Sequence, residues 1–294
     1  MNHAERAELL KQFRTPHGTL IGLTMTGFGP GEARTTIAYN PVFVGDTATG
    51  VLHGGLVTVL LDETCGLAVQ MAIEELVAIA TLDLRIDYMR PATPGLALNA
   101  RAVCYRMTKS VAFVRAAAYQ EDESKPVATV TASFMVGANR SDFKQHKSKV
   151  DFAQLQPLSA PEDPRGAFPE SPYARALGVQ VAQDGSTLLP YADKLIGNPL
   201  LPALHGGVLG AFLETTAMVG LRHDAAIAAR PVPINITVNY LRSGKPIDTF
   251  GRARIAKQGR RIVAFEARAW QTNPFEPIAS AYGHFMLKNE QADA

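Results

Sequence analysis

The sequence predicts an α+β protein in which one unit, a long helix wrapped by an antiparallel sheet, occurs twice in tandem. Three observations support this prediction. The motif His53-Gly54-Gly55 returns as His205-Gly206-Gly207 after a shift of 152 residues (205 − 53). Each motif opens an apolar segment of helical length with one acid nine residues on, and strand-like segments follow each helix in the same order. Internal repetition of this kind determines the architecture.

The repetition extends well beyond the motif. The same shift pairs Asp87-Tyr88-Met89-Arg90 with Asn239-Tyr240-Leu241-Arg242, and Val111-Ala112-Phe113 with Val263-Ala264-Phe265. After a slip of one residue, Phe134-Met135 meets Phe285-Met286. We therefore expect an N-terminal domain at 1–137 and a C-terminal domain at 172–294. Residues 138–171, which contain several prolines and lysines, are interpreted as a linker.

Each predicted unit begins with its helix and continues as a meander of strands. The first helix runs from His53 to about Met71, and the second covers about 205–222. Segments rich in β-branched and aromatic residues predict strands at 77–90, 96–107, 110–121 and 126–136, and again near 232–242, 248–258, 261–272 and 277–288. A helix that is apolar on most of its surface must be covered by the sheet, and two such units are expected to pair about a pseudo-two-fold axis.

Composition and charge narrow the classes of protein. The 294 residues are 47% hydrophobic and 19% charged, which is typical of a globular protein with a substantial core. The net charge of +2 gives no indication of nucleic acid or an acidic membrane as a partner. Cys65 and Cys104 form neither a metal-binding spacing nor a disulfide framework. No signal peptide and no uninterrupted apolar run of about 18 residues is visible, so we expect a cytoplasmic protein without a membrane partner.

A histidine followed by two glycines at the start of a helix suggests a place for a developing negative charge. The first N–H groups of a helix lack internal partners and carry partial positive charge, and glycine lets a ligand approach them closely. Such amides suit a carbonyl oxygen that becomes an oxyanion. The motif could instead be a simple turn. No metal site is expected, because one histidine and one acid on opposite helix faces do not make a ligand set.

The acids Asp62 and Glu214 lie about half a revolution around the helix from their histidines, at roughly 100° per residue. One helix can hardly direct both groups to the same substrate, so the acid of one unit is expected to serve the glycine amides of the other. Carboxylates in apolar helices are costly to bury unless they are partnered or functional. The sequence thus predicts two composite sites between the repeats.

On these residues the chain resembles the tandem (double) hotdog-fold thioesterases of the phenylacetate-pathway type, within the 4-hydroxybenzoyl-CoA thioesterase superfamily. The strand ends Tyr88-Met89-Arg90-Pro91 and Tyr240-Leu241-Arg242 add to the resemblance. It implies two hotdog domains and hydrolysis of an acyl-CoA thioester, with no cofactor besides the coenzyme A of the substrate. In the family pattern Gly54 and Gly206 donate the oxyanion-hole N–H, His53 and His205 shape the turn, and Asp62 and Glu214 act as nucleophile or general base.

The family pattern also includes a hydroxyl and an amide, and the two copies differ in both. Thr81 matches the hydroxyl residue after the helix, whereas its counterpart is Pro233. Asn198 lies near the position of the family's asparagine, whereas its counterpart is Asp46. We therefore expect one nearly complete site, made of Asn198, His205, Gly206, Asp62 and Thr81, and a less complete one around Glu214.

Coenzyme A carries phosphates, which need cationic partners. The candidates at strand ends and hairpin turns, each of which could equally be a solvated turn charge, are Arg90, Arg242, Lys109, Arg260 and Arg261.

Two other functions remain open from the sequence. The stretch Asn198-Pro199-Leu200-Leu201-Pro202 before His205 weakly resembles acyl-carrier-protein dehydratases, so a dehydratase or hydratase is one alternative. A non-catalytic acyl-CoA-binding module is the other, although retention of both acids argues against it. The acyl group, the choice between nucleophile and base, and the activity of each site stay undetermined. An exposed sheet edge favours a homo-oligomer of pseudo-dimers.

Overall fold

The computed structural model describes residues 3–12, 15–74, 77–137, 150–155, 157–158, 171–198, 202–225 and 230–288. The expected linker at 138–171 lies mostly outside these residues. Both cysteines, Cys65 and Cys104, are free thiols.

The first repeat contains one long helix and six strands of the main sheet. Its elements are α1 (His3–Gln12), α2 (Pro16–Leu20), β1 (Thr24–Gly29), β2 (Glu32–Ile37), the 3-10 turn η1 (Pro41–Phe43), β3 (Val44–Asp46), β4 (Val51–Leu52), α3 (Gly54–Ala72), β5 (Ile79–Tyr88), β6 (Leu98–Met107), β7 (Val111–Tyr119) and β8 (Ala128–Val136). A further 3-10 turn, η2 (Phe152–Gln154), follows it.

The second repeat contains the same elements in nearly the same order. They are α4 (Pro172–Leu177), β9 (Gln180–Val181), β10 (Thr187–Leu189), η3 (Asp193–Leu195), β11 (Ile196–Asn198), β12 (Ala203–Leu204), α5 (Gly206–Ala225), β13 (Arg230–Tyr240), β14 (Thr249–Gln258), β15 (Ile262–Trp270) and β16 (Ala279–Lys288). The prediction of a long helix followed by four long antiparallel strands is confirmed in both repeats.

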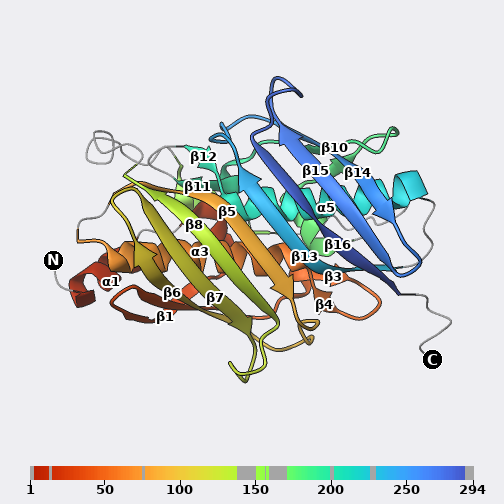
Figure 1. Cartoon of the computed structure of the whole chain (residues 1–294). Helices are drawn as coiled ribbons and strands as arrows, with labels where there is room; N and C mark the ends of the chain where they lie inside the picture. The colour runs from red at the N-terminus through yellow and green to blue at the C-terminus, as the bar shows by residue number, and fades with distance from the viewer. Residues whose placement is uncertain are drawn as a thin grey trace.

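All twelve main strands form one continuous sheet in the order β1-β2-β6-β7-β8-β5-β13-β16-β15-β14-β10-β9 (Figure 1). The two halves join where β5 pairs antiparallel with β13. In this register Arg85 faces Thr237, its own counterpart under the shift of 152 residues (237 − 85). A residue faces its own counterpart only when a two-fold axis passes between them. The pseudo-two-fold axis predicted from the sequence therefore crosses the β5–β13 pair.

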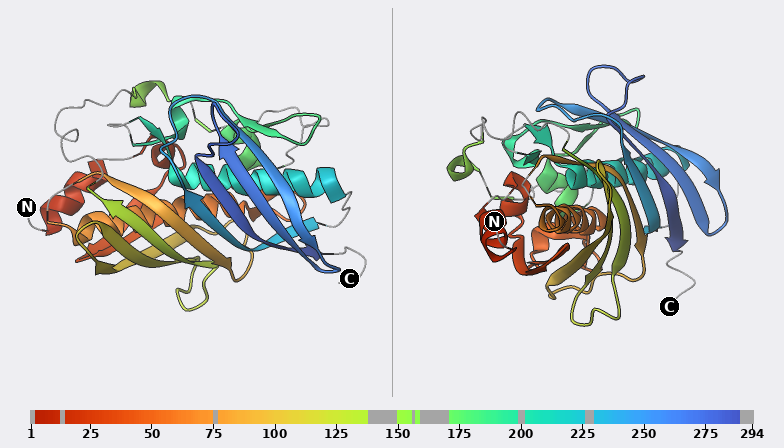
Figure 2. Two further views of the ribbon diagram at one scale, coloured as in Figure 1. Left: turned by 45° about the horizontal axis from the view of Figure 1, so that its top comes forward. Right: turned by 60° about the vertical axis from the view of Figure 1, so that its left-hand side comes forward.

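The two long helices pack against each other on one side of the curved sheet (Figure 2). Apolar side chains on most of their surface make this burial favourable: Leu56, Leu60 and Leu213 are fully buried. One expectation needs correction, since α3 has the length and mean hydropathy (1.3) of a membrane-spanning helix even with its two acids. In the protein 72% of that segment is buried, so α3 is placed here as a core helix.

In each repeat, a short helix ahead of the long helix packs against the other repeat. Helix α2 packs against η3 and β11 of the second repeat, and α4 packs against η1 and β3 of the first. His17 of α2 and Tyr173 of α4 meet through a hydrogen bond of 2.9 Å between Nε2 and the phenol oxygen. Segments of both repeats therefore surround the start of each long helix.

The close approach of β13 and β16 depends on Gly283. A Cβ atom at this position would lie 2.1 Å from the backbone oxygen of Asn235, which pairing with the neighbouring strands holds in place. We predict that Gly283→Ala lowers the free energy of unfolding by about 1–3 kcal/mol, as overpacking usually does. Urea denaturation measures this loss. Gly29→Ala is the matched control, because its Cβ would be 3.7 Å from the nearest side-chain atom. Equal midpoints for the two variants would contradict the prediction.

Candidate active site

Each repeated histidine caps the helix that follows it. Nδ1 of His53 accepts a hydrogen bond from the N–H of Gly55 at 2.8 Å, and Nδ1 of His205 accepts one from Gly207 at 2.9 Å. Both imidazoles are buried. The His-Gly-Gly motif is thus a capping device that partners one of the free N–H groups at the helix start. No described residue accepts a hydrogen bond from the N–H of Gly54 or Gly206.

The acid of α3 reaches the start of α5, across the two repeats. Oδ2 of Asp62 accepts a hydrogen bond from the N–H of Gly207 at 2.7 Å, and Oδ1 accepts one from the hydroxyl of Thr81 at 2.9 Å. The phenol of Tyr240 donates to the carbonyl of Gly206 at 2.8 Å. We call this cluster, made of Asp62, Thr81, His205, Gly206, Gly207 and Tyr240, the Asp62 site.

The acid of α5 makes the reciprocal crossing to the start of α3. Oε2 of Glu214 accepts a hydrogen bond from the phenol of Tyr88 at 2.9 Å, and its carboxylate also accepts one from the N–H of Gly55. Nδ1 of His53 lies 3.9 Å from Oε1 of Glu214. We call this cluster, made of Glu214, Tyr88, His53, Gly54 and Gly55, the Glu214 site.

Both sites require glycine directly after the histidine. A Cβ atom on Gly206 would lie 3.0 Å from Oδ2 of Asp62, and one on Gly54 would lie 2.3 Å from Oε1 of Glu214. A larger residue would push the acid away from the helix start. The first glycine of each motif therefore gives the acid its close contact with the neighbouring N–H groups.

Burial gives the two acids unusual proton affinities. It raises the pKa of Glu214 to about 7, even though the hydrogen bonds from Tyr88 and Gly55 act in the opposite direction. Burial also raises the pKa of Asp62, while the charge of His205 and the hydrogen bonds from Thr81 and Gly207 oppose this rise. Strongly shifted pKa values of buried carboxyl groups are typical of functional sites.

The two sites differ in the hydroxyl that reaches the acid. In the Asp62 site the donor is Thr81, near the start of β5, which the sequence placed in one site with Asp62. At the corresponding position the second repeat has Pro233, in β13, which has no hydroxyl to donate. Its acid is bound instead by Tyr88, at the far end of β5.

The remaining positions of the family pattern are less closely tied to the sites. Asn198 ends β11, where it pairs with Ala203, and its side chain lies outside the described residues. The carboxylate of Asp46 accepts hydrogen bonds from the backbone N–H groups of Ala48 and Thr49 and so closes a tight turn. This carboxylate is therefore already used in the turn.

Three residues in or beside the sites were not given a role from the sequence. Tyr88 and Tyr240 are counterparts in the repeated strand ends, but nothing in the sequence shows that their hydroxyls reach the helix starts. Glu63, next to Asp62, contacts His205 through a bond of 2.6 Å between Oε2 and Nε2. Comparison of the two copies could have indicated Glu63, because its counterpart is the uncharged Thr215.

The predicted phosphate-binding cations divide between the two ends of the sheet. At the end that carries Thr81, the N–H of Val136 donates to the carbonyl of Ser110, so the β6–β7 turn with Lys109 lies there. Arg242 lies two residues beyond Tyr240 at this same end. It donates one hydrogen bond to the carbonyl of Pro277 and is exposed.

The opposite end, which carries Tyr88, has the other three cations. Arg90 lies two residues beyond Tyr88 and binds the carbonyl of Lys125 through two of its nitrogens. The exposed Arg260 and Arg261 lie in the β14–β15 turn. The N–H of Leu287, near the end of β16, donates to the backbone carbonyl of Arg261, which places this turn at the same end of the sheet. Each site therefore lies toward a sheet end that carries one strand-end arginine and one cationic hairpin turn.

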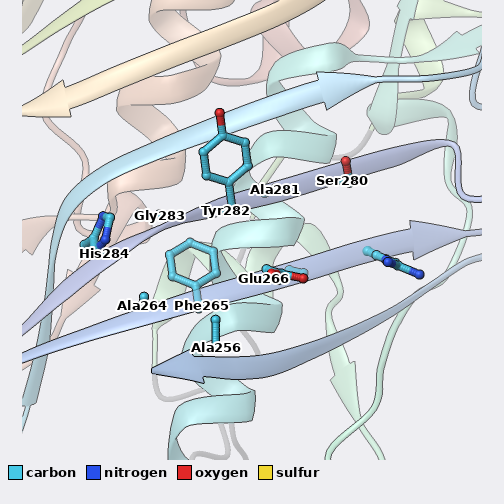
Figure 3. Close-up of a pocket in the computed structure, with 11 residues that line it drawn as sticks. Ala256, Ala264, Phe265, Glu266, Ser280, Ala281, Tyr282, Gly283 and His284 are labelled. Atoms are coloured by element: carbon cyan, nitrogen blue, oxygen red, sulfur yellow. The ribbon is translucent and has the colours of Figure 1, made fainter. Parts of the chain in front are cut away.

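The outer face of the sheet has a shallow hollow of about 350 Å³ over β14, β15 and β16. Figure 3 shows Tyr282 and His284 projecting from β16 beside Glu266 of β15. Neither Asp62 nor Glu214 lines this hollow. Within the described ranges, no group of three or more His, Cys, Asp or Glu is arranged to hold a metal ion.

Solved structures with the same architecture cover nearly the whole chain. The tesB protein of Mycobacterium avium subsp. paratuberculosis aligns over 92% of this chain and 98% of its own, with a TM-score of 0.63 and 10% identity. A provisionally named thioesterase from Novosphingobium aromaticivorans aligns over 90% of this chain and 98% of its own, with a TM-score of 0.62 and 14% identity. At these identities the likeness shows the fold, a tandem pair of hotdog domains.

Sequence comparison identifies the class of enzyme. The model of the thioesterase superfamily matches residues 49–127 and again 201–276, together more than half of the chain. Each match includes one His-Gly-Gly motif with its acid. The chain therefore belongs to the thioesterase superfamily, and it is an enzyme of the thioester hydrolase class.

Curated relatives match the chain over the length of one repeat. A provisionally named esterase from Halobacterium salinarum is 33% identical over 140 residues, which are 45% of this chain and 93% of the relative. The medium/long-chain acyl-CoA thioesterase YigI of Escherichia coli K12 is 27% identical over 138 residues, which are 42% of this chain and 88% of YigI.

The raised pKa of Glu214 predicts a pH-dependent stability. The folded-state pKa of about 7 exceeds the ordinary value of 4.5, so between these values the unfolded chain loses its proton first. The contribution of Glu214 to the free energy of unfolding is therefore fully present below pH 4.5. It is lost as the pH rises toward 7, and the total loss is on the order of 3 kcal/mol. Glutamine does not titrate, so the Glu214→Gln variant does not lose this contribution as the pH rises. Its free energy of unfolding, relative to that of the native chain, is therefore expected to increase from pH 5 to pH 8.

Urea denaturation at the two pH values measures this change. The exposed Glu121 provides the control, and Glu121→Gln is expected to track the native chain at both values. If the free energies of unfolding of Glu214→Gln and the native chain differed by the same amount at pH 5 and pH 8, this would be evidence against a raised pKa of Glu214.

Proposed function

We propose that the protein hydrolyses an acyl-CoA thioester to the free acid and coenzyme A, mainly at the Asp62 site. One observation carries the proposal: the buried carboxylate of Asp62 contacts the start of α5 beside the N–H of Gly206, which donates to none of the described residues. This arrangement combines a group that can attack or activate water with a donor for an oxyanion. The activity named for YigI supports acyl-CoA as the substrate class.

The geometry suggests how the reaction would proceed. The carbonyl oxygen of the thioester would accept a hydrogen bond from the N–H of Gly206. The partial positive charge at the start of α5 would then stabilise the negative charge of the tetrahedral intermediate. Asp62 would either attack the carbonyl carbon, giving an anhydride that water then hydrolyses, or remove a proton from an attacking water. In both routes the C–S bond breaks and the thiolate of coenzyme A leaves. Thr81 would hold Oδ1 of Asp62, so that the carboxylate keeps one orientation.

The Glu214 site is proposed to contribute less. Its acid is bound to the phenol of Tyr88, and a pKa of about 7 leaves a large fraction of Glu214 protonated at neutral pH. A protonated carboxyl group can neither attack a carbonyl carbon nor accept a proton from water. Pro233 supplies no hydroxyl to replace Thr81.

The cations at the sheet ends are proposed to bind the phosphates of coenzyme A. At the end near the Asp62 site these are Lys109 and Arg242, and near the Glu214 site they are Arg90, Arg260 and Arg261. A positive charge at the mouth of a site also raises the encounter rate with a polyanionic substrate. We further propose that the enzyme acts in the cytoplasm without another cofactor, and that pseudo-dimers associate into a homo-oligomer.

Two matched substitutions test the inequality of the sites. We expect Asp62→Asn to lower kcat for thiol release by about a hundredfold or more, and Glu214→Gln to lower it by less than about threefold, because only the first removes the main nucleophile or base. The assay measures free thiol across a panel of aromatic, short-chain and medium-chain acyl-CoA substrates. Equal losses in the two variants would overturn the assignment of the main site.

The same assay separates the alternative functions. Tight acyl-CoA binding without thiol release by the native chain would indicate a binding module. Loss or gain of one water by an intact thioester, detected by mass spectrometry, would indicate a dehydratase or hydratase. Either result would overturn the proposed hydrolysis.

A further inference from the structure

A second acid, Glu63, lies partly buried beside the Asp62 site and contacts the same histidine through its other ring nitrogen. Its Oε2 lies 2.6 Å from Nε2 of His205, and its side chain is 10% exposed. The hydroxyl of Thr15, just before α2, lies 3.1 and 3.0 Å from its two carboxylate oxygens. The same hydroxyl oxygen of Thr15 accepts a hydrogen bond from the N–H of Gly18 and so caps α2. Glu63 is therefore held in one position by an element that packs against the second repeat.

The hydrogen bonds determine where the proton of His205 lies. Nδ1 accepts the N–H of Gly207 at 2.9 Å, so this nitrogen must present a lone pair. In the neutral ring the proton is then on Nε2, from which it is donated to Glu63. The N–H of Gly207 is shared with Oδ2 of Asp62 at 2.7 Å. A continuous set of hydrogen bonds thus connects Glu63 to the reacting carboxylate through His205 and Gly207.

The second repeat supplies an internal comparison. Its residue at the position of Glu63 is Thr215, whose hydroxyl donates to the carbonyl of Ala211 at 2.9 Å within α5. His53 caps Gly55 in the same way as His205 caps Gly207. Its Nε2, however, is buried and has no hydrogen-bond partner among the described residues. The partner that fixes the imidazole proton is therefore present at one site, and none of the described residues supplies it at the other.

The proton affinities of the two histidines differ accordingly. Burial lowers the pKa of His53 to about 4. Burial also acts to lower the pKa of His205, but the hydrogen bond to Glu63 and the negative charges of Glu63 and Asp62 outweigh it, so the pKa is raised.

We propose that Glu63 is a positioning residue of the Asp62 site, which fixes the proton of His205 on Nε2 and so keeps Nδ1 available to the N–H of Gly207. The inference rests on the proposed hydrolysis at this site. It also gives a second reason, beside Pro233, for the lower contribution of the Glu214 site.

Loss of Glu63 has a defined physical consequence. Without an acceptor at Nε2, the neutral imidazole is free to carry its proton on Nδ1 instead. That proton would point at the N–H of Gly207, and two donors facing each other repel. The cap of α5 would open, and both the N–H of Gly206 and the contact between Gly207 and Asp62 would shift. A displacement of about 1 Å at reacting groups can cost a hundredfold in rate.

Three variants test the proposal. Glu63→Thr copies the residue of the second repeat, Glu63→Gln retains an oxygen that accepts the Nε2 proton, and Thr215→Ala is the matched control in the other repeat. We expect Glu63→Thr to lower kcat by about tenfold to a hundredfold with KM changed by less than about threefold, because Glu63 is proposed to act through His205 and not on the substrate. Glu63→Gln is expected to recover most of kcat, and Thr215→Ala to leave it unchanged.

Nitrogen-15 NMR of histidine-labelled protein gives a readout that does not depend on activity. At a pH above the raised pKa of His205, where the ring is neutral, His205 is expected to show the Nε2–H tautomer in the native chain and in Glu63→Gln, and a tautomer mixture or the Nδ1–H form in Glu63→Thr. An unchanged tautomer and unchanged kcat in a folded Glu63→Thr would overturn the proposal, as would a loss of kcat in Glu63→Thr that Glu63→Gln does not recover. If the native chain releases no thiol, the proposed function fails, whereas the tautomer comparison still decides the role of Glu63.

Discussion

The buried carboxylate of Asp62 is the constraint on which the rest of the structure depends. A charge that is removed from water must find donors inside the protein. Asp62 finds them at the start of a helix from the other repeat, through the N–H of Gly207, and at the hydroxyl of Thr81. This contact requires the two long helices to lie side by side, β5 to join β13, and glycine at position 206. The pairing of the repeats and the chemistry of the site are thus one arrangement.

Fusion of two copies in one chain lets the two sites differ. In a dimer of identical subunits each substitution appears at both sites, whereas here the copies vary independently. The second site has Pro233 where the first has Thr81, and Thr215 where the first has Glu63. Its acid is bound by Tyr88 and has a pKa of about 7. Burial keeps a larger fraction of Glu214 protonated, Pro233 offers this acid no hydroxyl, and Thr215 does not give His53 the partner that Glu63 gives His205; these differences are the physical reason why one site is proposed to carry most of the activity.

The segments before each domain connect the two sites through the interior. Nδ1 of the neutral His17 ring donates to the carbonyl of Lys194, so Nε2 accepts from the phenol of Tyr173, and the ring lies 6.2 Å from that of His205. Tyr173 lies 5.6 Å, ring to ring, from His53. Burial, together with the charge of His205, lowers the pKa of His17 to about 3, so this ring stays neutral. A neutral, hydrogen-bonded histidine fills the space between the sites without adding a charge to the interior.

The sequence by itself determined the duplication, the order of helix and strands, the acids on the far face of each helix and the unequal companions Thr81 and Pro233. These features are local or follow from comparing the copies, because helical periodicity and chain order are written residue by residue. Tertiary structure alone decided which groups meet: the phenols of Tyr88 and Tyr240, and the bond from His205 to Glu63. Such contacts join residues as many as 142 positions apart. They depend on the strand register and on how the two helices are packed, and no spacing within the chain records either of these.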